Sequence, residues 1–173
     1  MNWIIYFVLL SFTIYLCYNF AILSLFSTPQ SLSKTYYLFK ERKSWQKYLF
    51  PVMMISTAMT LISAWLEISN NSPFQFCAFF GVAGIIFTGM APAFQDDDTT
   101  KTIHTVSAII AAVFSILWII LVAKLWWVIV VWLIFVLLVS LLTQTLKSGT
   151  IYWLETIAFM STFTSIIIHF LSI

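Results

Sequence analysis

The chain has 173 residues, of which 62% are hydrophobic, 18% aromatic and only 8% charged, and its formal net charge is +2. Soluble domains contain about a quarter charged residues, so this composition excludes a soluble globular protein and predicts an all-α integral membrane protein. The small net charge does not support nucleic-acid binding, and the lysines and arginines act as topology signals instead. Because a span takes roughly 20 residues, the chain has room for about six, and we expect residues 1–173 to form one compact six-helix domain.

The first predicted helix covers residues 2–26. Its apolar run is longer than the core of a signal peptide, so we expect it to be retained as a span. The helix contains Asn19, and an unpaired amide in lipid costs several kcal/mol. Asn19 is therefore predicted to face another helix as a structural polar group.

The next connection, residues 27–47, is the most basic part of the chain. Its positively charged residues are Lys34, Lys40, Arg42, Lys43 and Lys47. By the positive-inside rule this connection is cytoplasmic, which places the N-terminus outside. Its aromatic residues alternate with the basic ones, a pattern typical of a short helix in the membrane interface, which Ser31 or Ser33 could cap. The basic residues either anchor the protein or recognise anionic lipid headgroups, and the sequence leaves both interpretations open.

Two further apolar helices are predicted at residues 48–68 and 73–91, joined by a short outer turn. We expect Trp65 and Glu67, near the end of the first, to lie at the outer interface. The second has the most small residues, and small side chains let helices approach closely, so it should lie centrally.

A polar corner with three consecutive carboxylates, Asp96, Asp97 and Asp98, leads into the fourth helix at residues 102–123. We interpret the acidic triplet as a structural, solvated turn in which an Asp or Thr caps that helix. The fourth helix carries His104 in its first turn and small residues four apart, which predicts a tight, central hairpin with residues 73–91.

The fifth helix, residues 125–144, is bulky and apolar and is predicted to face lipid. The sixth, residues 150–171, carries Glu155 near its start and His169 near its outer, solvated end.

Under this topology the polar residues of three cytoplasmic connections converge. His104 and Glu155 each lie about one helical turn inside a cytoplasmic helix start, where an imidazole and a carboxylate can form a hydrogen bond or an acid–base pair. The candidate ligand-binding residues are His104, Glu155, Ser31, Ser33, Tyr36 and Pro92. A structural pair, a ligand contact and a catalytic pair all remain open for His104 and Glu155.

Other chemistries have weaker signals. One histidine with carboxylates lacks the ligand spacing of a zinc site, and neither a Gly-rich phosphate loop nor a hydrolase elbow occurs in the sequence, so we expect no metal and no cofactor. Ser33 with His104 is too loose a pattern to predict a nucleophilic pair, and the sequence favours binding over catalysis.

Three functions follow from these residues. The favoured one is binding of a lipid or small amphipathic ligand in a cytoplasm-facing polar pocket between the third, fourth and sixth helices. The second is a small transporter or an oligomeric channel, since helices rich in small residues can surround a pathway. The sequence does not decide whether the protein forms a homo-oligomer. The third is an intramembrane lipid hydrolase or acyltransferase that uses Ser33, His104 and Glu155.

Short motifs along the chain resemble those of a known family. SLSKTYY in the first connection, GMAPAF at the end of the third helix, IHTVSAIIAAVFSILW at the start of the fourth and GTIYWLE at the start of the sixth are similar to six-helix membrane proteins of the Frag/DRAM/Sfk type, in particular to bacterial relatives of unknown function. The matching positions are Ser31, Ser33, Gly89, Pro92, His104, Gly149 and Glu155. Thr156 stands where the relatives tend to have Arg, so an ion pair within that motif is missing.

This resemblance implies a location in a bacterial cytoplasmic membrane. Eukaryotic members of the family are associated with lipid remodelling, lipid asymmetry and membrane trafficking, so the resemblance implies a lipid-related role. A shared fold does not by itself transfer an activity.

Overall fold

The computed structural model describes residues 3–172, and over that range the chain forms helices and no strands. The long helices are α1 (Trp3–Phe26), α3 (Leu49–Ile68), α4 (Phe76–Met90), α5 (Asp98–Trp118), α6 (Trp126–Leu142) and α7 (Thr150–Leu171). A short helix, α2 (Thr35–Arg42), and a 3-10 turn (Ser44–Tyr48) connect α1 to α3, and one π-helical turn (Ile119–Ala123) extends α5. The six expected long helices are therefore present, close to their expected bounds.

Within residues 3–172, four helical segments are long and apolar enough to cross a membrane, as expected of an integral membrane protein. They are Trp3–Phe26, Ser44–Ile68, Asp98–Ala123 and Thr150–Leu171. The other two long helices, α4 and α6, are apolar but shorter, with 15 and 17 residues.

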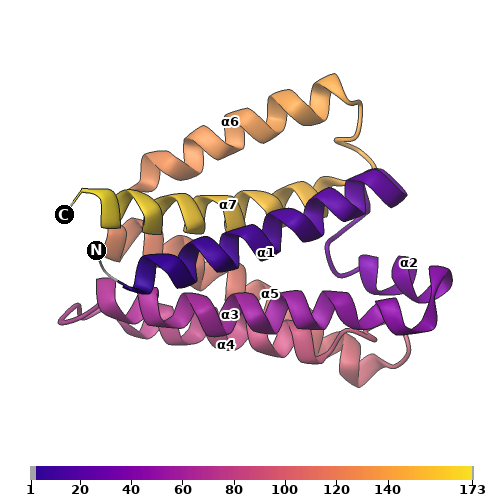
Figure 1. Ribbon diagram of the computed structural model, residues 1–173, viewed down its shortest axis with the longest axis horizontal. Coiled ribbons are helices and arrows are strands. Elements are labelled where there is room, and N and C mark those ends of the chain that lie inside the picture. Colours follow the sequence, from indigo (N-terminus) through magenta and orange to yellow (C-terminus); the bar gives the residue numbers. More distant parts are fainter. Residues whose placement is uncertain (1–2, 173) are drawn as a thin grey trace.

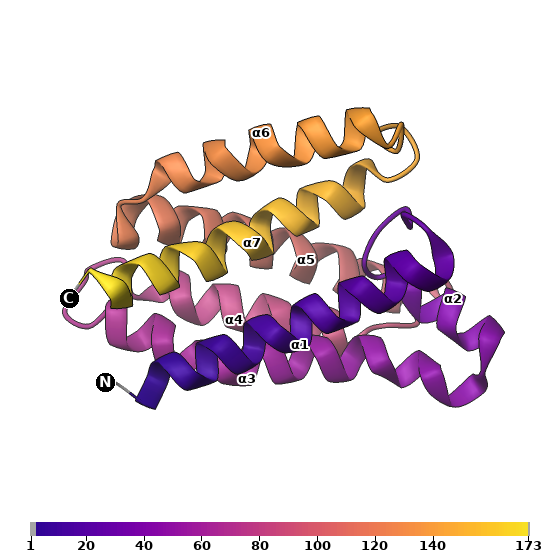
Figure 2. The ribbon, with the colours of Figure 1, turned by 45° about the horizontal axis from the view of Figure 1, so that its top comes forward.

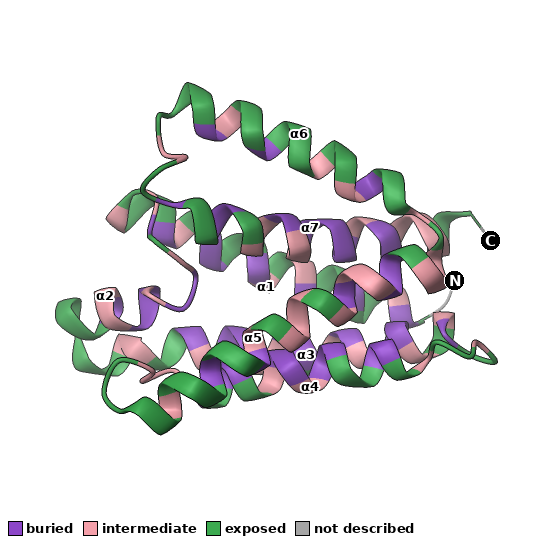
Figure 3. Ribbon diagram, turned by 180° about the vertical axis from the view of Figure 1, so that it is seen from behind, coloured by how far each residue is buried: buried purple, intermediate pink, exposed green. Residues whose placement is uncertain are grey.

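The long helices run side by side (Figures 1 and 2), and α3 packs on both α1 and α4, while α7 packs on α1. The α6 helix stands at the edge of the bundle beside α7, and most of its surface is exposed (Figure 3). Its buried residues are Val128, Val136 and Ser140. The α6 helix is therefore peripheral, and its contact with lipid stays a prediction.

The α4 and α5 helices form the expected tight hairpin. A Cβ atom added to Gly84 would lie 2.5 Å from the backbone nitrogen of Ala111 and 2.7 Å from the carbonyl oxygen of Ser107, so the two backbones are nearly in contact. The expected central position is wrong for α5, whose buried residues are only His104, Ser107, Ser115 and Trp118. One side of α5 packs on α4, and much of the rest of its surface is exposed apolar residues.

The α5 helix begins at Asp98, four residues earlier than expected, because Asp97 caps it. The Asp97 carboxylate accepts hydrogen bonds from the Thr100 backbone N–H at 2.7 Å and from the Thr100 hydroxyl at 2.5 Å. These two bonds hold the pKa of Asp97 below its ordinary value. The acidic triplet thus contributes the cap that its sequence predicted.

The first connection differs from the expected interfacial helix. Leu32, Tyr36 and Phe39 are buried, and α2 packs them against the end of the bundle. The Phe39 ring lies 5.0 Å from that of Phe26. Trp45 and Tyr48, at the far end of the connection, are 62% and 58% exposed, as interfacial anchors would be. The apolar face of α2 is therefore used for packing inside the protein.

Trp65 also departs from its expected place at the outer interface, because it is fully buried. Its ring lies 5.8 Å from that of Trp118, and Gly81 on α4 leaves room for it, since a Cβ there would come within 2.8 Å of the indole. Glu67 is exposed, as expected.

Candidate functional site

His104 is held between two separate parts of the chain. Its Nδ1 atom lies 2.9 Å from the carbonyl oxygen of Ala91, and its Nε2 atom lies 2.8 Å from the hydroxyl of Ser33. The ring stacks on Phe94, with 4.6 Å between ring centroids and 19° between planes. The side chain is only 5% exposed. Both ring nitrogens thus form hydrogen bonds, and one ring face is covered by Phe94.

These partners determine the tautomer. A carbonyl oxygen only accepts, so the Ala91 contact requires the proton to be on Nδ1. In the neutral imidazole Nε2 then accepts, and the Ser33 hydroxyl donates to it. The imidazole is therefore arranged as a base toward Ser33.

The corner between α4 and α5 creates this arrangement. Pro92 has no N–H and disfavours helical geometry in the residue before it, so α4 ends at Met90 and the Ala91 carbonyl is left without a helical partner. The first turn of α5, capped by Asp97, brings His104 to that carbonyl. Pro92 acts here by shaping the backbone and does not line the cavity described below.

Glu155 contacts the same connection as His104. Its Oε2 atom accepts a hydrogen bond from the backbone N–H of Leu32 at 2.7 Å. Leu32 directly precedes Ser33, the partner of His104. Within the described residues, His104 and Glu155 are therefore joined through two consecutive residues of the first connection and not by the direct pair that the sequence suggested.

A narrow cavity of about 60 Å³ lies between α3, α4, α5 and α7 and reaches Ser33 and Glu155. Most of its lining is apolar, including Phe50, Met54, Leu61, Trp65, Ala108 and Ala112. On α3 the lining residues extend over about 22 Å of helix, from Phe50 to Trp65. The cavity thus has a polar part near the first connection and a long apolar part.

Further polar contacts hold the first connection against α1 and α7. The Tyr18 hydroxyl bonds with that of Thr35, and the backbone N–H of Tyr152 donates to the carbonyl of Gln30 at 3.1 Å. The Tyr152 hydroxyl also donates to Oδ1 of Asn19 at 3.0 Å. Asn19 is therefore the interhelical polar contact that the sequence predicted.

Two other predicted ligand residues lie away from the cavity lining. The Ser31 hydroxyl accepts the backbone N–H of Lys34 at 3.1 Å, which caps the turn before α2. Tyr36 is buried in the core, with its ring 5.1 Å from that of Tyr37. Both residues shape the connection, whereas Ser33 and Glu155 line the cavity.

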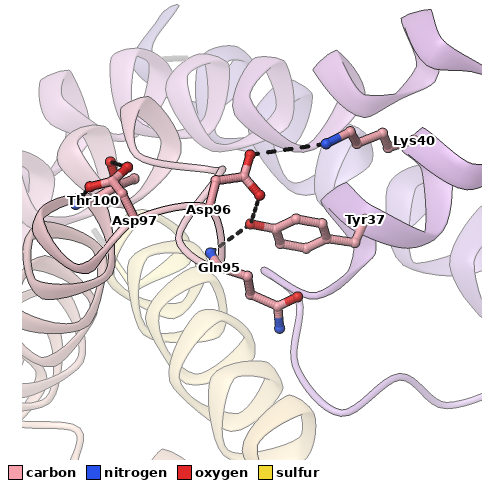
Figure 4. Close-up of polar contacts among 6 residues, drawn as sticks. All are labelled: Tyr37, Lys40, Gln95, Asp96, Asp97 and Thr100. Carbon is pink, nitrogen blue, oxygen red and sulfur yellow. Dashed lines mark hydrogen bonds and ion pairs between the residues drawn. The ribbon is translucent and has the colours of Figure 1, made fainter.

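The polar corner and α2 are joined at the surface (Figure 4). The Tyr37 hydroxyl accepts the backbone N–H of Gln95 at 2.6 Å and donates to Asp96 at 3.5 Å, and Lys40 lies 4.0 Å from the same carboxylate. Partial burial raises the pKa of Tyr37, and the Asp96 charge adds to this rise. Lys34 donates to the Gln95 side chain at 3.0 Å. Two of the five basic residues therefore contact this corner.

Sequence reasoning missed the backbone partners of the site. The Leu32 N–H and the Ala91 carbonyl belong to every residue type and have no sequence signature. The alanines that line the cavity from α5 were assigned to close helix packing. Within residues 3–172, no group of three or more His, Cys, Asp or Glu side chains is placed to hold a metal ion.

Comparisons with family models, with curated proteins and with solved structures found no match to this chain.

Proposed function

We propose that this protein binds a lipid or another amphipathic molecule, with its acyl chain in the apolar part of the cavity and its polar end beside Ser33 and Glu155. The observation that carries the proposal is the lining of this cavity, in which Ser33 and Glu155 adjoin a long apolar wall. Ligand pockets are mostly apolar and supplied with a few polar groups, and this lining has that composition. At about 60 Å³ the cavity is smaller than the roughly 300–1,000 Å³ of ligand pockets, so the surrounding side chains must move apart to admit an acyl chain.

The dimensions favour a chain-like ligand. The lining follows α3 over about 22 Å, which exceeds the roughly 15 Å of hydrocarbon in one leaflet. An acyl chain that enters near Ser33 could therefore follow α3 toward Trp65 once the lining side chains move apart.

The polar end favours a ligand with hydrogen-bond donors. Glu155 uses Oε2 for the Leu32 N–H, which leaves Oε1 as an acceptor for a hydroxyl or an amine. We infer a ligand whose end near Glu155 carries a hydroxyl or an amine group.

For the membrane, we propose six spans with the N-terminus outside and the α2 end on the cytoplasmic side of a bacterial cytoplasmic membrane. The support is the positive charge near that end, where Lys34, Lys40, Arg42, Lys43 and Lys47 lie in one connection. In this orientation Ser33 and Glu155 face the cytoplasmic leaflet, and the exposed basic residues of α2 and its end lie at the level of anionic headgroups.

The test is to fill the cavity. Ala112 lines it from α5, so Ala112→Phe should exclude most of the bound lipid. The lipid that remains with the purified protein is measured by native mass spectrometry and lipid extraction. Ile109→Phe is the matched control, because Ile109 lies on the same helix and is 57% exposed. We expect at least a tenfold lower lipid occupancy for Ala112→Phe and no change for the control. Equal lipid content in the wild type and Ala112→Phe, with both folded, would rule out binding in this cavity.

A further inference from the structure

The contact between Ser33 and His104 suggests chemistry in addition to binding. A nucleophile, a base within hydrogen-bond distance and a third group that orients the base form the recurring arrangement for covalent acyl transfer. Ser33, His104 and the Ala91 carbonyl stand in this order, with 2.8 Å and 2.9 Å between the bonded atoms. We propose that Ser33 is an acyl-accepting nucleophile and that His104 is its general base.

The orientation of the imidazole is fixed by more than its hydrogen bond to Ser33. The Ala91 carbonyl fixes the proton on Nδ1, and the stacked Phe94 ring fixes the plane, so Nε2 is directed at the Ser33 oxygen. The orienting group is a neutral carbonyl and not a carboxylate. It stabilises an imidazolium less than a carboxylate would, so we expect slow turnover.

The position of Ser33 indicates the substrate class. Ser33 lines the cavity, whereas His104 lies behind it and is absent from the lining. A carbonyl group beside Ser33 would have the apolar part of the cavity for the chain attached to it. The substrate class that follows is an ester of a long-chain fatty acid. This assignment of the substrate rests on the proposed lipid binding.

The reaction would proceed in two steps, acylation of Ser33 and hydrolysis of the acylated serine. In the first, Ser33 Oγ bonds to the ester carbonyl carbon and its proton moves to His104 Nε2. The bond from that carbon to the alcohol oxygen breaks, and the alcohol leaves with the proton from Nε2. In the second, water gives a proton to Nε2 and its oxygen bonds to the carbonyl carbon, after which the fatty acid leaves and Ser33 Oγ regains a proton. One ester and one water give one fatty acid and one alcohol.

The experiment uses the full chain in detergent and a fluorophosphonate with a long alkyl chain, a probe that bonds covalently to activated serines. Intact mass gives the extent of labelling, and peptide mapping gives its position. We expect an adduct on Ser33 of the wild type and none in Ser33→Ala. In His104→Gln, labelling should be at least 100-fold slower, which is the lower end of the usual contribution of a general base. Ser140→Ala is the control, because Ser140 is a buried serine of α6 outside the cavity lining and should not change the labelling rate.

Labelling of the wild type tests whether Ser33 is the nucleophile even if a variant does not fold. No adduct on Ser33 of the folded wild type, or an adduct on another serine, overturns the nucleophile proposal. Equal labelling rates in wild type and folded His104→Gln overturn the assignment of the base. Lipid occupancy in Ala112→Phe is measured separately, so a protein that binds lipid in the cavity without labelling at Ser33 loses only this inference and keeps the proposed binding function.

Discussion

The hydrogen bond from Leu32 to Glu155 gives the sharpest test of how the first connection is held. Leu32 is 2% exposed, so water cannot easily replace the carboxylate that its N–H contacts at 2.7 Å. Glu155→Leu removes the acceptor and leaves the N–H without a partner. A hydrogen bond contributes about 0.5–1.5 kcal/mol, and a buried donor left without a partner costs about 1–3 kcal/mol. We therefore expect Glu155→Leu to lower the free energy of unfolding by about 2 kcal/mol.

Glu155→Gln is the matched variant, because its amide oxygen can still accept the Leu32 N–H. It should lose less than about 1 kcal/mol, since a neutral acceptor forms a weaker bond. Stability is measured by reversible unfolding in mixed detergent, and hydrogen–deuterium exchange reports on residues 30–36. These amides should exchange slowly in the wild type and in Glu155→Gln, and faster in Glu155→Leu.

Two results would refute this reasoning. If Glu155→Leu is as stable as the wild type and residues 30–36 remain protected, the bond does not anchor the connection. If Glu155→Gln is destabilised as strongly as Glu155→Leu, the charge of Glu155 matters and its acceptor role does not. In the second case the contact with Leu32 would be incidental to an electrostatic effect.

The remaining predictions concern the helix hairpin and its cap. Gly84→Ala should destabilise the protein by about 1–2 kcal/mol. The new Cβ would meet the backbone of Ala111, which places the cost in the upper part of the usual overpacking range of about 1–3 kcal/mol, and the helix-propensity gain offsets about 1 kcal/mol of it. Unchanged or higher stability in the same unfolding assay would contradict the close packing. Asp97 has a pKa below its usual 3.8 in the folded protein, so its stabilising effect is present above that value and is lost as the pH falls through the folded pKa. Asp97→Asn should therefore show a smaller loss of stability on acidification than the wild type, and identical acid profiles would exclude a role for the charged cap.

The helices could largely be predicted from the sequence. In lipid, a long apolar run can form all its backbone hydrogen bonds internally only as a helix. The length of each run and the polar residues between runs therefore locate the helices. The structure begins and ends α7 at the expected residues 150 and 171 and ends α1 at the expected residue 26, while the expected start of α1 at residue 2 lies outside the described residues. The Asn19 contact between helices and the Asp97 cap were also expected, because a lone amide in a span and an Asp before a helix each have few alternatives.

The position of α2 could not be predicted in this way. Leu32, Tyr36 and Phe39 alternate with polar residues, and that pattern suits a membrane surface and a protein surface equally well. Which surface they cover depends on the space left at the end of the bundle, and there Phe39 packs against Phe26. Trp65 illustrates the same limit, because its burial depends on the absence of a side chain at Gly81 on a different helix.

The sequence by itself determined that this is a helical membrane protein, approximately where its helices begin and end, and that His104 and Glu155 lie near one end of the bundle. Only the tertiary structure decided what these two residues contact. Their partners are the Ser33 hydroxyl, the Ala91 carbonyl and the Leu32 N–H, which come from segments up to 123 residues away along the chain. Backbone groups are the same in every residue, so their pairing across the fold depends on three-dimensional packing that no local pattern records.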